Sequence, residues 1–440
     1  MLIDFSVENY KSIKDTLSLN MEMVVLSDVP DVYEGQINRI DVNVVNDGKE
    51  KVWKYCSVSP IMALFGANAS GKSNVFKALI AMRAIVMGGK VEDYYNPYKL
   101  DKKTKGGVTK FSVVFEKDGF VYSYAIAFGS NYVDNESLYW WEKPNAKKRK
   151  IFDLSGEKFN EIGVLPRHLA DCVISRSSML SVLYLHGDVE EKFYSHIKRV
   201  RDFFADDIVV AEDVDRFALG SDEQVAQRDV DVVRNLMNSM DVECDKIVLN
   251  RRLKKKILDN SLTDISEIEK IRADVQTDGA LVSVDCEAGV IYADEILLEY
   301  GEQKMNLMVD ESTGTRNIFR LLLAVIEGLR RGKIFVFDEI DRTIHTELIK
   351  FLFALVKAEG LNKNGGQMLC SSHNPCVMLG LGLFEIALVD KIKNATVVRY
   401  ASEYDYGKKD VSVNDVFDNY MLGVIGGMPR VVGIYEGMEI

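Results

Sequence analysis

Apolar and polar positions along the chain form two kinds of pattern, which together predict a mixed α/β protein. Leu2 to Val7 is expected to be a strand, and a polar turn separates it from a second apolar segment, Thr16 to Leu26. Ile61 to Phe65 is a continuous apolar run, typical of a strand buried on both faces, and Asn74 to Ile85 after it favours a helix. Residues 26–54 are polar and aperiodic, so we expect a surface loop there.

β-rich runs follow the first helix. They cover Thr109 to Glu116, Phe120 to Phe128 and Tyr132 to Trp141, and the Asp-Gly turn between the first two is a strong hairpin signal. We therefore expect an antiparallel sheet inserted after the helix. From Arg167 to about Ala205, and again from Val230 to Met240, apolar residues recur at three- and four-residue steps, which predicts amphipathic helices.

Charged residues dominate parts of the middle of the chain. We expect the segment Arg251 to Arg272 to be a solvated helix or a mobile excursion, with an arm for nucleic acid or a partner as the alternative. The basic run Lys147 to Lys150 is likewise expected to be solvated, and contact with nucleic acid or phosphate is the minority interpretation. Leu281 to Ala293 looks like a further hairpin.

Beyond residue 300 the α/β pattern returns. The pattern predicts helices from Ile318 to Leu329 and Thr346 to Lys357, and apolar strands at Lys333 to Phe337 and Met368 to Ser372. A strand, a helix and a second strand form a βαβ unit, whose strands are parallel. We therefore expect residues 1–90 and 301–440 to be two halves of one α/β core, with a mixed sheet flanked by helices, and residues 91–300 to be an inserted α+β lobe.

Composition narrows the function classes. The chain has 440 residues, of which 47% are hydrophobic and 28% charged, as in ordinary soluble globular proteins. No run reaches the roughly 18 apolar residues of a membrane helix, and the first residues do not resemble a signal peptide, so we expect a cytoplasmic protein. The six cysteines lack C-x-x-C spacing, which favours free thiols. A net charge of −12 argues against a protein coated in nucleic acid but leaves room for a local basic groove.

The strongest motif is the sequence from Gly66 to Ser73, which matches the phosphate-binding pattern G-x-x-x-x-G-K-[ST]. Glycines let backbone N–H groups close around phosphates, and the following helix supplies positive potential. Lys72 is expected to reach the β- and γ-phosphates of ATP, and Ser73 to offer its hydroxyl to Mg²⁺; a plain glycine-rich turn is the alternative. The residues expected to bind the nucleotide here are Gly66, Ala67, Asn68, Ala69, Ser70, Gly71, Lys72, Ser73 and Asn74.

Two adjacent carboxylates, Asp338 and Glu339, follow the apolar strand that ends at Phe337. Ligands bind at the carboxyl ends of parallel strands. We expect Asp338 to hold Mg²⁺ together with Ser73, and Glu339 to orient or deprotonate the water that attacks the γ-phosphate. The alternative is a strand that ends in two solvated acids.

Weaker signals flank this pair. A Ser/Thr/Gly-rich turn containing Ser312 and Gly314 precedes a helix, and it is either a second anion site or an ordinary helix cap. His373 follows the apolar strand that ends at Ser372. If that strand lies next to the strand of Asp338, His373 would face the γ-phosphate; otherwise it is a structural histidine.

In this order, the elements resemble the ABC/SMC type of P-loop ATPase, and the resemblance implies that fold. It also implies a head-to-tail dimer in which the signature turn of one subunit closes on the ATP of the other. The signature sequence is Ser-Thr-Gly-Thr here rather than Ser-Gly-Gly-Gln, and Gln224 is only a guess for the Q-loop. The roles implied by the resemblance are Lys11 and Ser12 near the nucleotide, Ser312 to Thr315 as signature, Asp338 as metal ligand, Glu339 as catalytic base, Asp341 in the D-loop and His373 as switch histidine.

Further motifs resemble the AbiL/RloA-like ATPases of abortive infection and phage defence, relatives of the OLD nucleases. That resemblance implies an ATP-hydrolysing, Mg²⁺-dependent sensor or switch subunit, a homodimer or higher oligomer, that controls a separate nuclease or other toxin. Alternatives are a scaffold that sequesters an effector with little turnover, or an ATPase of the DNA-repair type; a membrane partner is not expected. The matching segments are Met1 to Ser12, Phe65 to Asn74, Asp338 to Asp341 with His345, Ser371 to Asn374, Asn419 to Gly423 and Met428-Pro429.

Overall fold

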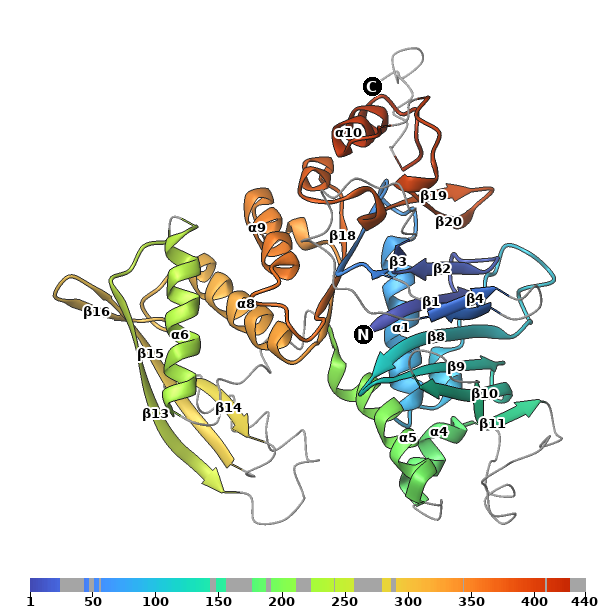
Figure 1. Ribbon diagram of the computed structural model, residues 1–440, viewed down its shortest axis with the longest axis horizontal. Helices are drawn as coiled ribbons and strands as arrows, with labels where there is room; N and C mark the ends of the chain where they lie inside the picture. The colour runs from blue at the N-terminus through green and yellow to red at the C-terminus, as the bar shows by residue number, and fades with distance from the viewer. Residues whose placement is uncertain are drawn as a thin grey trace, which may run out of the picture. The chain divides into compact units, whose positions relative to one another are not determined.

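The computed structural model shows a mixed α/β protein, as predicted (Figure 1). The described residues are 1–23, 43–46, 51–54, 57–142, 148–155, 176–186, 191–210, 223–240, 242–256, 279–285, 290–342, 344–407 and 410–427. Contacts divide the chain into unit 1, residues 1–208 with 332–440, and unit 2, residues 209–331. The boundaries expected from the sequence, near residues 90 and 300, remain predictions.

The first sheet of unit 1 carries the phosphate loop. Its strand order is β17-β18-β7-β19-β20, and β12 at its edge lies where the chain passes from unit 1 to unit 2. β7, β17 and β18 are parallel, and every residue of β7 is buried, as its apolar run predicted. The strands are β7 (Ile61–Phe65), β12 (Ile208–Val210), β17 (Ile334–Phe337), β18 (Gln367–Ser372), β19 (Ile386–Ile392) and β20 (Ala395–Tyr400).

Helices of unit 1 follow these strands closely. α1 begins directly after the phosphate loop, and α9 connects β17 to β18 in the predicted βαβ unit (Figure 1). Apolar residues at three- and four-residue steps form their buried faces, for example Phe76 and Leu79 in α1. The helices are α1 (Lys72–Val86), α2 (Val91–Tyr94), α4 (Met179–His186), α5 (Glu191–Asp202), α9 (Thr346–Lys357) and α10 (Val413–Met421).

The second sheet of unit 1 is antiparallel, with the order β11-β10-β9-β8-β1-β2. The predicted antiparallel sheet is thus confirmed, but it recruits the N-terminal strands, since β1 pairs with β8 along its length. Aromatic side chains build its core; the rings of Phe115 and Phe203 stack at 3.7 Å. The strands are β1 (Leu2–Glu8), β2 (Leu17–Asn20), β8 (Thr109–Lys117), β9 (Phe120–Phe128), β10 (Val133–Glu142) and β11 (Arg149–Ser155).

Unit 2 contains a small antiparallel sheet and two long helices. The hairpin predicted at Leu281 to Ala293 is confirmed, because β14 pairs with β15 in antiparallel register. The elements are α6 (Glu223–Asn238), β13 (Lys246–Lys256), β14 (Leu281–Asp285), β15 (Val290–Tyr300), β16 (Gln303–Asn306) and α8 (Thr313–Arg330).

The structure corrects the expectation for the basic segment that begins at Arg251. Residues 251–256 are the second half of strand β13, not a solvated helix or excursion. The guanidinium of Arg251 lies in the sheet, pairs with the buried carboxylate of Asp294 and packs 4.5 Å from the Tyr292 ring centroid. Strand pairing and this ion pair outweigh the local charge pattern. Residues 257–272 lie outside the described residues.

The stretch expected to be a surface loop, residues 26–54, also contains strands. β4 (Asn43–Asn46) and β5 (Lys51–Lys54) pair as an antiparallel ladder. Their sequences are rich in Val and Trp and flank an Asp-Gly pair, which is a hairpin signal that the sequence analysis overlooked. β3 (Glu22–Met23) and β6 (Ser57–Val58) pair nearby in the chain.

Other expectations concern cysteines, membranes and undescribed residues. Cys244, Cys370 and Cys376 are free thiols. Among the described helices, none is long and apolar enough to cross a membrane. Expectations for Lys147, for residues 167–175 and for Met428-Pro429 lie outside the described residues, as do Cys56, Cys172 and Cys286.

Candidate nucleotide site

The phosphate loop connects β7 to α1, as its sequence predicted. Gly71 precedes α1 with φ of 110°, a backbone conformation that residues with a side chain rarely adopt. A Cβ atom on Gly71 would also collide with the hydroxyl of Thr396, and one on Gly66 would collide with the carbonyl oxygen of Val389. Both glycines of the motif are therefore required by the local geometry.

The backbone N–H groups at the amino-terminal end of α1 lack the side-chain caps that usually accept their hydrogen bonds. Its N-cap, Gly71, makes no side-chain hydrogen bond, and its first turn holds no acidic residue. The Ser70 hydroxyl is buried without a hydrogen-bond partner among the described residues. Uncapped amides and an unpaired hydroxyl at a helix start fit an anion such as a phosphate.

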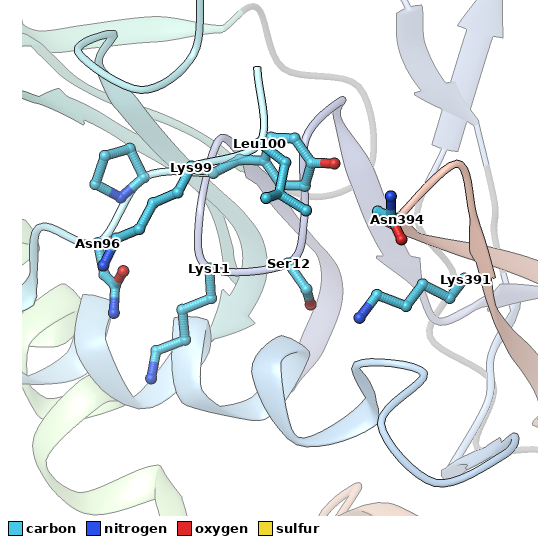
Figure 2. Close-up of a pocket in the computed structure, with 9 residues that line it drawn as sticks. Lys11, Ser12, Asn96, Lys99, Leu100, Lys391 and Asn394 are labelled. Carbon is cyan, nitrogen blue, oxygen red and sulfur yellow. The ribbon is translucent and has the colours of Figure 1, made fainter. Parts of the chain in front are cut away.

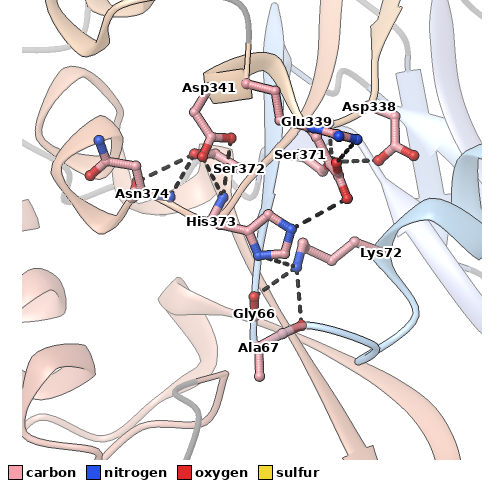
Figure 3. A network of polar contacts seen from close by, with 11 residues as sticks. Gly66, Ala67, Lys72, Asp338, Glu339, Asp341, Ser371, Ser372, His373 and Asn374 are labelled. Atoms are coloured by element: carbon pink, nitrogen blue, oxygen red, sulfur yellow. Dashed lines mark hydrogen bonds and ion pairs between the residues drawn. The ribbon is translucent and has the colours of Figure 1, made fainter.

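Lys72 places a buried ammonium group at the same point. Its Nζ donates hydrogen bonds to the carbonyl oxygens of Gly66 at 2.7 Å and Ala67 at 3.1 Å, and lies 3.2 Å from His373 Nδ1 (Figure 3). Burial lowers the pKa of Lys72, while the carboxylates of Glu339 and Asp338 act in the opposite direction. A buried cation held mainly by carbonyl oxygens fits an incoming phosphate.

Asp338 and Glu339 leave β17 at the sheet edge where the phosphate loop leaves β7. β18 lies between these two strands, in parallel register with both. The buried Ser371 of β18 connects the pair: its hydroxyl donates to Asp338 Oδ1 at 2.6 Å and accepts the backbone N–H of Glu339 at 2.8 Å. Glu339 has φ of 53°, in the left-handed region. The sequence analysis counted Ser371 in a matching segment with His373 but gave it no role at the site.

His373 joins the two sides of the site (Figure 3). Its backbone N–H lies 3.2 Å from both carboxylate oxygens of Asp341, and its Nε2 lies 3.5 Å from Glu339 Oε1. β18 pairs with β17 as predicted, so one network contains Lys72, Glu339, Asp341 and His373. That His373 faces a γ-phosphate remains a prediction.

The Glu339 carboxylate has a second partner. Arg342 Nη1 lies 2.9 Å from Glu339 Oε2, and the side chain of Arg342 is 75% exposed. An exposed pair of this kind contributes little to stability and exchanges readily with other partners. Glu339 is therefore held between His373 and Arg342 by contacts that ligand binding can replace.

The N-terminal turn is tied to the phosphate loop through Ser12. Its hydroxyl accepts from Asn74 Nδ2 at 2.7 Å and lies 2.7 Å from Thr396 Oγ1, which in turn donates to the carbonyl oxygen of Ser70 at 2.8 Å. Lys11 is adjacent, with its backbone N–H bonded to the Asn96 carbonyl oxygen at 2.6 Å. Thr396 was not among the predicted site residues, and no sequence motif marks it.

Ser312 and Gly314 belong to unit 2, whereas the other predicted site residues belong to unit 1. The Ser312 hydroxyl accepts the backbone N–H of Thr315 at 3.1 Å, so Ser312 is the N-cap of α8. Its further role as a signature residue remains a prediction. Gln224, the guess for the Q-loop, lies in α6 of the same unit.

The metal assignment rests on few side chains. Within the described part of the chain, no group of three or more His, Cys, Asp or Glu residues is arranged to hold a metal ion. Mg²⁺ typically takes one or two protein oxygens and completes its shell with phosphates and water. The predicted pair, Ser73 and Asp338, suits that kind of ion rather than a metal held by protein alone.

A family model described as "AAA domain, putative AbiEii toxin, Type IV TA system" matches residues 61–378. No curated protein matches the chain.

The solved structures that are similar to this chain include three SMC head domains, each below 15% identity. An SMC head domain from Thermotoga maritima has 14% identity and a TM-score of 0.37, covering 91% of this chain and 98% of that one. An SmcHead bound to the C-winged helix domain of ScpA has 12% identity and a TM-score of 0.41, covering 91% and 97%. An Smc head with an extended coiled coil, bound to the C-terminal domain of ScpA derived from Pyrococcus furiosus, has 10% identity and a TM-score of 0.43, covering 96% and 98%.

The fold class expected from the sequence is confirmed. The phosphate loop after β7, the carboxylate pair after β17 and the intervening strand β18 form an ABC/SMC-like P-loop NTPase core, a mixed sheet flanked by helices.

Proposed function

Because the chain belongs to the family of AAA domains described as "AAA domain, putative AbiEii toxin, Type IV TA system", we propose that it is a Mg²⁺-dependent ATPase that acts as the switch subunit of a bacterial phage-defence system. One observation carries the ATPase part: Lys72, Glu339 and His373, from three distant segments, meet at the phosphate loop (Figure 3). The defence role is supported by the family description and by the motifs that resemble AbiL/RloA-like proteins.

ATP binding replaces contacts that the site makes within the chain. The backbone N–H groups at the start of α1 would donate hydrogen bonds to the phosphates, and Lys72 would turn its ammonium from the Gly66 and Ala67 carbonyl oxygens toward them. Mg²⁺, held by Ser73 and Asp338, would offset the negative charge of the phosphates.

Hydrolysis needs a positioned water and a carboxylate. Glu339 orients or deprotonates this water, and His373, between Lys72 and Glu339, fixes the carboxylate and the γ-phosphate relative to each other. Ser371 is a positioning residue, because its hydroxyl holds both the Asp338 carboxylate and the Glu339 backbone.

Switching follows from dimer closure. In this proposal the Ser312 and Gly314 turn of a second copy contacts the bound ATP, so that the closed dimer exists only with nucleotide, and hydrolysis opens it. The closed form controls a separately encoded effector, a nuclease or other toxin, in the cytoplasm.

The test is the mass of the protein with and without Mg-ATP, measured by light scattering during gel filtration. Glu339→Gln is expected to reduce turnover by about 10²-fold or more and to stabilise an ATP-dependent dimer. Glu347→Gln is the matched control and should behave like the parent, because Glu347 is an exposed acid on α9 whose ion pair within the described residues is with Lys350. A Glu339→Gln protein that hydrolyses ATP at the parental rate contradicts the assignment.

A second candidate, the effector-binding scaffold with little turnover, is favoured by one observation. Both carboxylate oxygens of Glu339 already have partners, Arg342 at 2.9 Å and His373 at 3.5 Å, so Glu339 must exchange one of these contacts for a water before it can act as a base. A mass that does not respond to ATP, together with a copurifying protein from a neighbouring gene, would support the scaffold.

A further inference from the structure

A hollow of about 250 Å³ lies beside the phosphate loop (Figure 2). Its walls come from three separate stretches of unit 1: the N-terminal turn with Lys11 and Ser12, the segment from Asn96 to Leu100, and the β19–β20 hairpin with Lys391 and Asn394. Ser12 also belongs to the hydrogen-bond network of the phosphate loop. The hollow is therefore next to the nucleotide site but has walls of its own.

Lysines dominate these three stretches. Residues 11–15, 96–105 and 390–396 contain eight lysines and three aspartates, in a chain whose net charge is −12. Lys99, Lys391 and the neighbouring lysines 102, 103, 105 and 393 are exposed. Of the three acids, Asp101 is paired with Lys14, and Asp390 accepts the backbone N–H of Gly427. The rim of the hollow is thus a local basic surface on an acidic protein.

The three lysines that line the hollow lack acidic partners among the described residues. Lys99 and Lys391 form no ion pair there, and the Lys11 amine lies 5.6 Å from the Tyr10 ring centroid. Burial and the neighbouring Lys77 lower the pKa of Lys11. Positive charge is therefore concentrated in the hollow without being neutralised.

The basic clusters that the sequence analysis singled out differ in this respect. Lys148 packs 4.4 Å from the Tyr139 ring centroid and Arg149 packs 4.9 Å from that of Trp140. Arg251 is paired with the buried Asp294. Those cations contribute to the fold of their own sheets, whereas the lysines of the hollow point to a ligand.

Tight turns shape two of these stretches. Lys393 and Asn394, with φ of 48° and 67°, are the two turn residues of the β19–β20 hairpin, in which Ile392 pairs with Ala395. Lys11, with φ of 51°, lies in the turn closed by the bridge between Tyr10 and Ile13. The turns account for these left-handed conformations, so the sign of a ligand is the charge of the lysines that line the hollow.

We infer that this hollow binds the phosphodiester backbone of a nucleic-acid strand, without reading its sequence. Lysine amines provide point charges for phosphates, and several of them on three stretches around one hollow suit a polymer of phosphates better than a single small anion. Leu100 and Ile392, exposed at 70% and 42%, are single apolar side chains at the rim that can contact bases.

An anionic membrane fits this surface less well. A bilayer is flat on the scale of the hollow, so it would reach the rim but not Lys11, which lies partly buried in the wall. Two isolated apolar side chains also provide little insertion into lipid. A nucleic-acid strand, in contrast, can place a phosphate inside the hollow.

The test is binding of a fluorescent oligonucleotide of about 20 nucleotides, single-stranded or duplex, DNA or RNA, followed by anisotropy without ATP. The double variant Lys99→Glu with Lys391→Glu is expected to bind at least about tenfold more weakly. The plot of log K against log salt concentration should also become less steep, by about 0.7 for each phosphate of a single strand that the protein no longer neutralises. Lys198→Glu with Lys363→Glu makes the same charge change at exposed lysines that do not line the hollow and lie outside the basic run Lys147 to Lys150, and it should stay near parental affinity. If the double variant Lys99→Glu with Lys391→Glu fails to fold, Lys99→Gln with Lys391→Gln is tested in its place.

Several results would overturn the inference. One is a parental protein that binds no oligonucleotide at about 50 mM salt. Others are equal weakening by both double variants, or binding to vesicles of anionic phospholipid instead of oligonucleotides. A separate nucleotide titration covers one more outcome: if Lys99→Glu with Lys391→Glu weakens ATP binding but leaves oligonucleotide binding at the parental level, the hollow holds the nucleoside part of ATP and the inference is wrong. Since binding is measured without ATP, the result is independent of the proposed ATPase activity.

Discussion

Two helix starts of this protein carry sequences that predict anion binding, and the structure treats them differently. α1 in unit 1 begins after Gly71, with no side-chain cap and with the Ser70 hydroxyl buried and unpaired within the described residues. α8 in unit 2 begins after Ser312, whose hydroxyl accepts the Thr315 backbone N–H. The start of α1 leaves its backbone N–H groups available to a ligand. At the start of α8, by contrast, the Ser312 side chain already accepts one of these N–H groups.

The surroundings extend the difference. At α1, the Nζ of the buried Lys72 lies 3.2 Å from His373 Nδ1. The carboxylates that act on Lys72, those of Asp338 and Glu339, come directly after strand β17. At α8, Arg316 is the nearby cation, and it donates to the Met308 carbonyl oxygen at 2.9 Å. A glycine before a helix therefore predicts anion binding more strongly than a serine does. The hydroxyl of a serine can accept a backbone N–H of the first turn as an N-cap, whereas a glycine leaves that N–H free for an anion.

The largest expected effect separates the glycines of the two helix starts. Gly71→Ala forces a side chain into left-handed backbone, at about 1–2 kcal/mol, and into the Thr396 hydroxyl, so we expect loss of ATP binding and a lower melting temperature. For Gly314→Ala, the neighbour of the new Cβ within the described residues is the Ser312 hydroxyl at 3.6 Å, an ordinary contact, so this variant should keep or slightly raise stability. Nucleotide titration and thermal unfolding of both variants measure this; equal behaviour would remove the distinction.

The next effect concerns the support of the α1 site. Ser371→Ala removes the hydrogen bond to the charged Asp338 carboxylate and the one from the Glu339 backbone N–H; a hydrogen bond to a charged group contributes about 1.5–3 kcal/mol, and solvent at the exposed Asp338 offsets part of the loss. We expect turnover to fall about tenfold or more, with a higher Mg²⁺ concentration needed for half-maximal rate.

Ser372→Ala is the matched control, since the hydrogen bonds of this buried hydroxyl within the described part of the chain are with the backbone of Asn374. Its turnover and Mg²⁺ requirement should stay near parental values. If both serine variants lose activity with an unchanged Mg²⁺ requirement, Ser371 has only a structural role.

The smallest effect tests the α8 start. Ser312→Ala removes the cap and is expected to cost about 1 kcal/mol of stability. Ser312→Asp keeps a capping oxygen but adds negative charge, so it should preserve the melting temperature while abolishing ATP-dependent dimerisation. Calorimetry and light scattering measure the two properties separately. Parental dimerisation by Ser312→Asp would mean that this turn is only a helix cap.

Local patterns predicted most elements of the chain. The apolar run Ile61 to Phe65, the Asp-Gly hairpin of β8 and β9, and the helix Thr346 to Lys357 each depend on neighbouring residues, and each is confirmed. Two predictions of local structure, for the segment at Arg251 and for residues 26–54, were wrong for other reasons. The basic segment at Arg251 became a strand because Asp294, more than 40 residues away, neutralises it. The β4–β5 hairpin was missed because its short signal lies within a polar stretch.

The sequence by itself determined the phosphate loop, the carboxylate pair and the alternation of strands and helices, because these are properties of residues close together in the chain. Only the tertiary structure decided that Ser371 holds Asp338 and Glu339, that Thr396 and Ser12 brace the loop, and that three lysine-bearing stretches surround one hollow. These groups lie far apart in sequence, so their meeting depends on strand order and register, which no local pattern encodes.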